Sequence, residues 1–165
     1  MPTLKMKPLS PQAFLPYGRY ASMSDPCGPA LGGAPIRFFR DLLPLGSADN
    51  LAASVTLVEP MPMVVDVLEY HSHAWEAFMM LDADACVCVG PATADQRAPL
   101  DALEAFHVPA GTMIYLHPGV WHYAPYPLGE RALHSLVLLP ERTYANDCVK
   151  VSVAPAEQPT IAAAL

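Results

Sequence analysis

The chain has 165 residues, of which 53% are hydrophobic and 15% are charged, so it predicts a folded protein and excludes a disordered one. Its net charge is −7 and it has no run of Lys or Arg, which argues against a nucleic-acid-binding surface. No apolar stretch is long and uniform enough to cross a bilayer, and the N-terminus lacks the apolar segment of a signal peptide. We therefore expect a cytoplasmic protein that binds neither nucleic acid nor a membrane.

The first half of the chain predicts one helical turn followed by a loop and three strands. Ser10 is placed to cap the turn, Pro11 occupies its first position and Gly18 ends it. Glycine, proline and serine are frequent in residues 22–35, which predicts a loop. The three strands are expected at residues 36–40, 53–59 and 63–70.

The second half predicts further short strands. Residues 77–81 and 85–89 read as a hairpin around Asp82 and Asp84, with the two acids in a solvated turn. A short helix is expected at residues 100–105, and the remaining strands at 113–116, 133–139 and 147–153.

The number of prolines, 19, favours this pattern of turns and short strands over long helices. Many short strands with little helix predict an all-β fold, either a closed β-barrel or a jelly roll. The length predicts a single domain over residues 1–165, in which residues 154–165 form a mobile tail.

Four of the six histidines lie in two clusters, each beside a predicted strand. Residues two apart in a strand share a face, so His71 and His73 point the same way, as does Glu69 before them. Glu76 follows, at a place where a bend could turn it inward. These groups are the nitrogen and oxygen ligands that divalent metals bind.

The second cluster covers residues 111–122. Tyr115 and His117 share a strand face, and His122 follows a Pro118-Gly119 turn that can direct it toward the same cavity. We therefore predict that His71, His73, Glu76 and His122 meet in one cavity and that they can hold a divalent ion. For His107 and His134 we expect an ordinary hydrogen-bonded role.

The two clusters resemble the two sequence motifs of the cupin superfamily. His71-x-His73 followed by Glu76 is similar to the first motif, although Glu76 comes early and Ala83 stands where a glycine is expected. Gly111, Gly119 and His122 fit the spacing of the second motif, with His117 in the place of a proline. The resemblance implies a cupin-type double-stranded β-helix, a jelly-roll barrel, with one or two short helices.

Within the cupins, the chain from about residue 9 to residue 153 resembles the ureidoglycolate lyase family. The resemblance is carried by blocks of residues along the chain, most specifically by Tyr115-Leu116-His117 with Val120-Trp121-His122. The other blocks are Pro8-Leu9-Ser10, Ala13-Phe14, Tyr17-Gly18, Arg40-Asp41-Leu42, Leu68-Glu69-Tyr70-His71, Ala77-Phe78 and Asn146-Asp147-Cys148.

The resemblance implies cleavage of ureidoglycolate into glyoxylate and urea, a step in purine catabolism and allantoin degradation. This reaction needs a base for the C2 hydroxyl proton, an acid for the leaving nitrogen and a partner for the substrate carboxylate. We expect His122, His71 and Glu76 to be catalytic. His117, Tyr115 and Arg40 are the candidates for substrate binding, with Arg37 as an alternative to Arg40 for the carboxylate.

Two other functions remain open from the sequence. The chain could be another metal-dependent cupin enzyme, such as an oxygenase or isomerase, which His71-x-His73 favours. It could instead be a non-catalytic cupin that binds a small carboxylic acid. In each case we expect a small-molecule ligand and a homodimer, because closed two-fold assemblies are the most common and cupin barrels leave an outer sheet free to pair.

Overall fold

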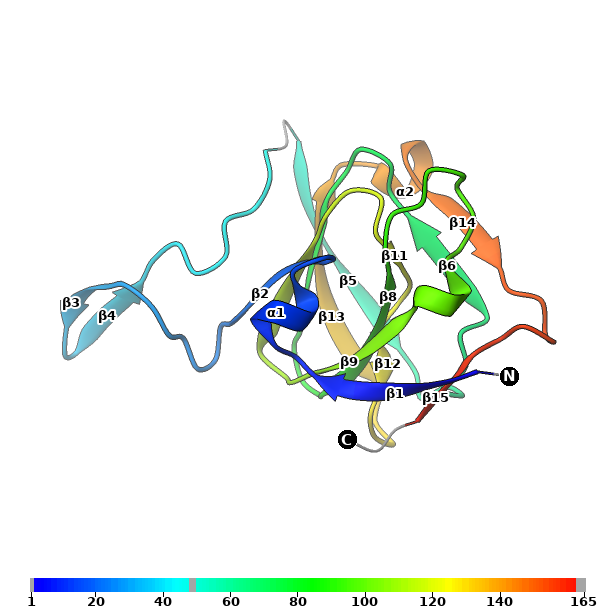
Figure 1. Cartoon of the computed structure of the whole chain (residues 1–165). Helices are drawn as coiled ribbons and strands as arrows, with labels where there is room; N and C mark the ends of the chain where they lie inside the picture. Colours follow the sequence, from blue (N-terminus) through cyan, green and yellow to red (C-terminus); the bar gives the residue numbers. More distant parts are fainter. Residues whose placement is uncertain (1, 48–49, 163–165) are drawn as a thin grey trace.

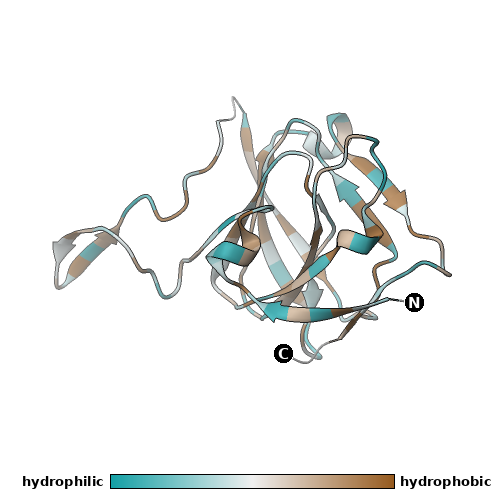
Figure 2. Cartoon of the chain, in the orientation of Figure 1, coloured by the Kyte–Doolittle hydropathy of each residue, from teal (hydrophilic) through white to brown (hydrophobic). Residues whose placement is uncertain are grey.

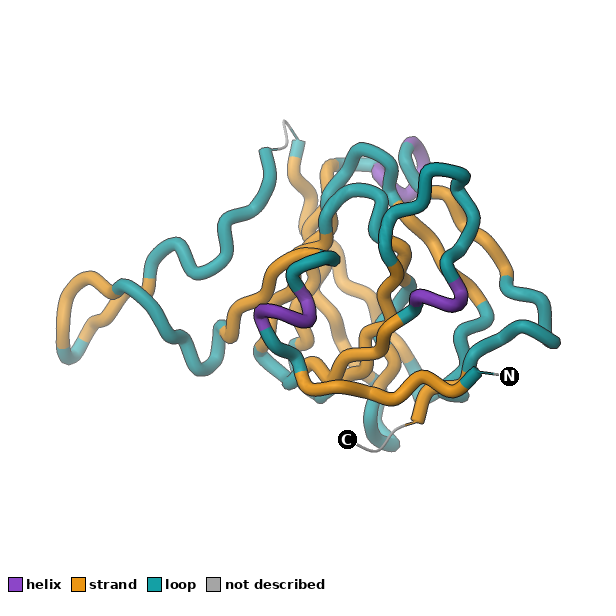
Figure 3. The backbone as a smooth tube through the Cα atoms, in the orientation of Figure 1, coloured by secondary structure: helices purple, strands orange, loops and turns teal. Residues whose placement is uncertain are grey.

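The computed structural model describes residues 2–47 and 50–162, and its architecture is two β-sheets that face each other. Figure 1 shows the barrel they form, with the first and last strands, β1 and β15, at its lower edge. Figure 3 shows how little of the chain is helical. The helical segments are α1 (Pro11–Phe14), η1 (Leu100–Ala102) and α2 (Thr143–Asn146).

The larger sheet has the order β14-β6-β11-β8-β9-β1-β15, with β12 also paired to β8. Its strands are β1 (Thr3–Pro8), β6 (Val67–Tyr70), β8 (Ala85–Gly90), β9 (Glu104–Val108), β11 (Trp121–His122), β12 (Tyr126–Pro127), β14 (Val149–Ser152) and β15 (Thr160–Ala162). The smaller sheet has the order β2-β10-β7-β13-β5. Its strands are β2 (Gly18–Ser22), β5 (Leu51–Val58), β7 (Glu76–Met80), β10 (Thr112–Leu116) and β13 (Leu133–Pro140).

The strand pairing is that of a jelly roll. In residues 51–140, the outermost strands pair with each other and the inner ones follow in the same way. Strand β5 pairs with β13, β6 with β11, β7 with β10 and β8 with β9, all antiparallel. This nesting is what results when one long hairpin is rolled up, with its paired strands going alternately to the two sheets. The predicted double-stranded β-helix with short helices is therefore confirmed.

The core occupies two layers, one between the sheets and one behind the larger sheet. Strand β8 separates them, and all six of its residues are buried. Val87 and Val89 pack between the sheets, whereas Cys86 and Cys88 pack in the outer layer with Trp121. Because alternate residues of a strand face opposite sides, burial on both faces explains why this strand is apolar throughout.

Several local predictions are confirmed. Ser10 accepts a hydrogen bond from the backbone N–H of Ala13 at 3.3 Å and caps α1, as expected. The short helix predicted at residues 100–105 is present but shorter, as η1 over Leu100–Ala102. The predicted strand at 63–70 is shorter than expected, since β6 covers only Val67–Tyr70.

The predicted hairpin of residues 77–81 and 85–89 is wrong. Strand β7 belongs to the smaller sheet and β8 to the larger one, so the segment between them crosses from sheet to sheet. Asp82 and Asp84 in this segment also do more than form a solvated turn, because each contacts a histidine. Asp82 lies 2.6 Å from His134 Nδ1, and Asp84 lies 2.8 Å from His107 Nε2. The expected hydrogen-bonded role of these two histidines is confirmed.

The predicted loop at residues 22–35 and the predicted mobile tail also need correction. The loop contains β3 (Ala30–Gly33), which pairs with β4 (Ile36–Phe39) as a hairpin. We call residues 30–39 the arm, because Figure 1 shows this hairpin projecting away from the barrel. In the tail, β15 pairs in parallel with β1 and its Ile161 is buried, so burial of an apolar side chain anchors residues 160–162.

Candidate active site

The candidate site is built around Glu76, the first residue of β7. Its Oε2 atom lies 2.7 Å from His122 Nε2 and 3.2 Å from His71 Nε2. All three side chains are almost completely buried. The structure therefore brings together the three residues expected to be catalytic, from three different segments of the barrel.

The backbone orients both imidazole rings. His71 Nδ1 donates to the carbonyl oxygen of Asp147 at 2.6 Å, and His122 Nδ1 donates to that of Val120 at 2.9 Å. Since a carbonyl oxygen only accepts, each Nδ1 carries a proton and each Nε2 is directed at Glu76. This arrangement, with one ring nitrogen held by a carbonyl and the other facing the site, is that of histidines that bind metals or transfer protons.

The turn before His122 depends on Gly119. Its φ of +83° lies in the left-handed region, where glycine is favoured because it has no Cβ. The Gly119 N–H donates to the carbonyl oxygen of His71 at 2.7 Å. The turn thus attaches the second histidine cluster to the first and directs His122 into the barrel, as the sequence predicted.

Charges in the cluster shift two pKa values in opposite directions. Burial alone would raise the pKa of Glu76. His122 and His71 outweigh this effect through their charges and their hydrogen bonds to the carboxylate, and they lower the pKa to about 2. Burial alone would lower the pKa of His122, but the charge of Glu76 and its hydrogen bond outweigh this effect and raise it. Glu76 is therefore a carboxylate at neutral pH, and its charge favours the protonated form of the His122 ring.

Glu69 is a fourth member of the cluster. One ligand atom each from Glu69, His71 and His122 lies within 4.8 Å of the other two. Glu69 stands directly opposite His122 on β11 and opposite Lys150 on β14. Its Oε2 forms an ion pair with Lys150 Nζ at 3.2 Å and accepts a hydrogen bond from Cys148 Sγ at 3.5 Å.

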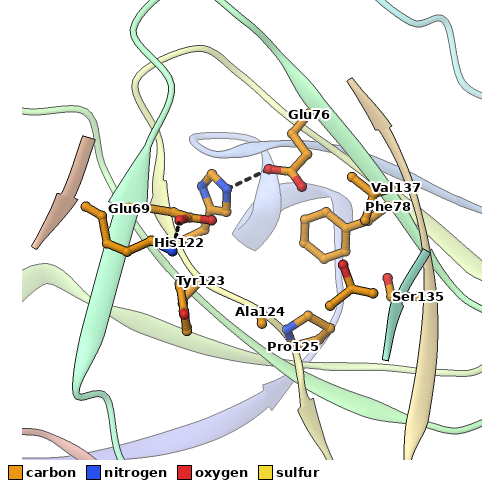
Figure 4. A pocket seen from close by; sticks show the side chains of 11 residues that line it. Glu69, Glu76, Phe78, His122, Tyr123, Ala124, Pro125, Ser135 and Val137 are labelled. Carbon is orange, nitrogen blue, oxygen red and sulfur yellow. Dashed lines mark hydrogen bonds and ion pairs between the residues drawn. The ribbon is translucent and has the colours of Figure 1, made fainter. Parts of the chain in front are cut away.

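Four of these groups, those of Glu69, Glu76, His122 and Lys150, line a cavity of about 200 Å³ between the two sheets. Figure 4 shows Glu76 and His122 joined across its upper part, with Glu69 beside His122. Phe78, Val137 and Pro125 provide apolar walls. Among the described residues, 2–47 and 50–162, Lys150 is the only Lys or Arg that lines this cavity. A small anionic molecule with polar groups fits this lining.

His73 is not brought to the site, contrary to the prediction. Strand β6 ends at Tyr70, so the alternation of side chains that placed His73 beside His71 does not continue. The His73 side chain is 92% exposed. Glu69, which shares the strand face with His71, takes the place that the sequence assigned to His73.

Tyr115, His117 and Arg40 also lie away from this cavity. Leu116 and Ile114 point into the core, so Tyr115 between them faces the outside of the smaller sheet. There its ring lies 5.5 Å from that of His117. Arg40 follows the arm and forms an exposed ion pair with Asp41 at 2.6 Å. Arg37, the alternative, lies on the arm as well.

Lys150, Glu69 and Ser135 line the cavity but were not predicted from the sequence as site residues. Glu69 carried a usable signal, since it precedes His71 by two residues in the same strand. Lys150 and Ser135 carried none, because they lie in late strands without a motif and reach the cavity only through long-range pairing.

Asp147 holds the segment between β6 and β7 in place. Its carboxylate accepts hydrogen bonds from three consecutive backbone N–H groups, those of residues 72–74, at 2.8 to 2.9 Å. Burial alone would raise the pKa of Asp147, but these hydrogen bonds and the nearby His73 lower it. Because this segment joins His71 to Glu76, Asp147 positions two members of the cluster.

We expect Asp147→Asn to lower the free energy of unfolding by about 2 kcal/mol, since hydrogen bonds to a charged group are being lost. A folded-state pKa below the usual 3.8 stabilises the fold above pH 3.8, and this contribution disappears as the pH falls through the lowered value. Urea denaturation at pH 7 and below pH 3.8 measures both effects, so the variant and the parent should converge in acid. Asp95→Asn, which affects a backbone hydrogen bond and an exposed ion pair, both with Arg97, is the control. An equal loss at both pH values would contradict this assignment.

Comparison with known proteins identifies relatives of this chain. The model of the family described as "Ureidoglycolate lyase" matches residues 1–160. A protein of Pseudomonas syringae pv. tomato named ureidoglycolate lyase is 31% identical over 130 residues, which cover 74% of this chain and 75% of that protein. One of the same name from Burkholderia cepacia is 26% identical over 127 residues, which cover 74% and 71% of the two chains.

Among solved structures, oxalate decarboxylase of Bacillus subtilis is similar with a TM-score of 0.44 and 21% identity, over 63% of this chain and 24% of that one. Oxalate decarboxylase of Lactobacillus farciminis has the same TM-score with 16% identity, over 63% and 27%. Within the described residues, no helix combines the length and hydropathy needed to cross a membrane.

Proposed function

We propose that this chain, which belongs to the ureidoglycolate lyase family, cleaves ureidoglycolate into glyoxylate and urea. The observation that carries the proposal is Glu76 bridging two buried imidazoles at the wall of a small cavity. The reaction breaks the bond between C2 and a urea nitrogen. It therefore needs one group that takes the C2 hydroxyl proton and one that gives a proton to the nitrogen.

Glu76 and His122 supply both functions as a pair. His122 Nε2 gives its proton to the leaving nitrogen, and Glu76 takes the proton of the C2 hydroxyl as that oxygen becomes the aldehyde of glyoxylate. The charge of His122 holds the Glu76 pKa low, so loss of this charge makes Glu76 a stronger base during the reaction. A proton transfer over 2.7 Å from Glu76 to His122 restores the starting state.

Lys150 binds the substrate carboxylate in this proposal. It is held at the cavity by Glu69, and its hydrogen bond and charge interaction with Glu69 raise its pKa despite partial burial, so it carries a positive charge at neutral pH. This role replaces the one that the sequence analysis assigned to Arg40, which ion-pairs with Asp41 beyond the arm.

A divalent ion fits the same cluster as an alternative to the proton on His122 Nε2, because one ring nitrogen cannot bind an ion and donate a proton at the same time. His71 and His122 present nitrogen atoms, Glu76 and Glu69 present carboxylate oxygens, and both Nδ1 atoms are held by carbonyl groups in the way typical of metal ligands. An ion bound there supplies positive charge that stabilises negative charge developing on a substrate oxygen.

We expect protein purified without chelator to contain a divalent ion, measured by elemental analysis. His71→Ala should lose this ion because it removes a ligand, whereas His73→Ala should keep it because the exposed ring takes no part in the cluster. Absence of metal in the parent, with no uptake on addition, would contradict the metal proposal but not the proton transfers between Glu76 and His122.

The activity is tested by incubating the protein with ureidoglycolate, with and without added divalent metal, and following glyoxylate release. The parent should turn over, and Glu76→Gln should lose most of the rate because an amide cannot accept the hydroxyl proton. A folded parent protein that releases no glyoxylate under any metal condition would refute the proposed function.

We also propose that two copies associate through the outer face of the smaller sheet. Thr56 and Ser135 line the cavity, so their neighbours Val55 and Leu57 face outward, where more than half of each side chain is exposed. The arm exposes Ile36 and further apolar side chains, and Figure 2 shows brown residues along it. Large exposed apolar surfaces of this kind are typical of protein interfaces.

Val55→Glu places a charge in the proposed interface, and we expect it to convert a dimer into a single chain. Light scattering at micromolar concentration measures the mass, and Gln12→Glu, an exposed position on α1, should remain dimeric. A parent protein with the mass of one chain would rule out this assembly.

We propose a cytoplasmic location as well. The four cysteines are unpaired, and Cys27 is exposed. Free exposed thiols are stable in the reducing cytoplasm and are oxidised elsewhere.

A further inference from the structure

The cavity contains a polar atom that the proton transfers do not use. The Oγ atom of Ser135 is buried and has no hydrogen-bond partner among the described residues. The residue is 0% exposed, yet it lines the cavity. Because buried polar groups in folded proteins are nearly always hydrogen-bonded, an unpartnered hydroxyl facing a cavity indicates that a ligand supplies the partner.

A second hydroxyl-bearing residue, Thr56, stands beside it. Thr56 lies on β5 directly opposite Ser135 on β13, and both residues line the cavity. Figure 4 shows Ser135 next to the apolar side chains of Phe78 and Val137, on the side of the cavity away from Glu69 and His122. We call Ser135 and Thr56 the hydroxyl pair.

The cavity is therefore divided by sheet. The larger sheet carries Glu69, His122 and Lys150. Lys150 is the only Lys or Arg in the described cavity lining. On the smaller sheet, the one ionisable lining residue is Glu76, which lies against His122, so no Lys or Arg of that sheet faces the hydroxyl pair in the described lining. A ligand with one charged and one neutral polar end would bind with its neutral end at the hydroxyl pair.

We propose that the hydroxyl pair recognises the neutral carbamoyl group, –CO–NH₂, at the urea end of the substrate. This inference rests on the proposed function and adds the residues that determine specificity. A hydroxyl oxygen accepts hydrogen bonds, so Ser135 Oγ can accept one from the –NH₂ group, which distinguishes this end from an acetyl group. Ser135 thus acts as a specificity residue, and the chemistry remains with Glu76 and His122.

The test uses two inert probes that differ only at this group. N-carbamoylglycine carries the carboxylate and the –CO–NH₂ end but lacks the C2 hydroxyl, so it cannot be cleaved. N-acetylglycine has a methyl group in place of –NH₂. Dissociation constants of both are measured by calorimetry for the parent, for Ser135→Ala and for Ser152→Ala, an exposed serine on β14 that serves as control.

We expect the parent and Ser152→Ala to bind N-carbamoylglycine more tightly than N-acetylglycine. Ser135→Ala should lose about tenfold in affinity for N-carbamoylglycine and little for N-acetylglycine, as expected for loss of one buried hydrogen bond. The melting temperature of unliganded Ser135→Ala should not fall, because no hydrogen bond within the described protein is removed. A purely structural role of Ser135 would lower that temperature.

The inference is overturned if Ser135→Ala keeps the parent's preference between the two probes, or if the parent has none. Its failure is distinguishable from failure of the proposed function. A parent that cleaves ureidoglycolate while Ser135→Ala leaves the preference unchanged refutes only the role of Ser135. A parent that shows the serine-dependent preference but releases no glyoxylate refutes only the lyase activity.

Discussion

His122→Ala should reduce kcat for glyoxylate release by about 100- to 10,000-fold, the usual contribution of one acid or base group. The His122 ring lies 2.7 Å from Glu76 and lines the cavity, whereas His71, the other imidazole at Glu76, is not among the cavity-lining residues and so is not placed to replace it. Removal of His122 also removes the largest influence that lowers the Glu76 pKa. Steady-state kinetics with ureidoglycolate measures the effect.

The matched control is His107→Ala. This histidine also contacts a carboxylate, that of Asp84 at 2.8 Å, but at the barrel surface outside the cavity lining. It should therefore retain the parent's kcat. Far-UV circular dichroism shows whether each variant remains folded. Parent-level turnover in folded His122→Ala would refute the catalytic assignment, and loss of folding in both His122→Ala and His122→Asn would assign His122 a structural role instead.

Lys150→Met should raise KM for ureidoglycolate by about 10- to 100-fold with a much smaller change in kcat. Methionine has nearly the same length but cannot pair with a carboxylate, and a hydrogen bond to a charged group corresponds to a change of this order. Within residues 2–47 and 50–162, no Lys or Arg other than Lys150 lines the cavity, so none can replace it there. Initial rates over a wide substrate range separate KM from kcat.

Lys7→Met provides the comparison for that variant. Lys7 Nζ forms an ion pair with Glu104 at 2.6 Å, and its exposure is similar to that of Lys150, but it does not line the cavity. Its KM should equal that of the parent. A lower kcat with unchanged KM in Lys150→Met would show that the lysine does not hold the carboxylate of the bound substrate.

The sequence predicted the site where local rules were sufficient. Spacing of His71 and Glu76, together with the glycine turn before His122, identified the three residues that meet in the barrel. The prediction failed where it assumed that a strand continued, as at His73, which lies beyond the end of β6. It also failed for Tyr115, because alternation shows which residues share a face but not which face is inside.

By itself, the sequence determined the all-β class, the family resemblance and the roles of His71 and His122 in the cluster, because strand alternation, turn residues and motif spacing act over a few neighbouring residues. Only the tertiary structure decided which polar groups share the cavity. Lys150 reaches Glu69, and Ser135 reaches Thr56, through pairing of strands about 80 residues apart in the chain, which depends on how the barrel closes. The placement of Lys150 on one sheet and of Ser135 and Thr56 on the other is a consequence of that closure.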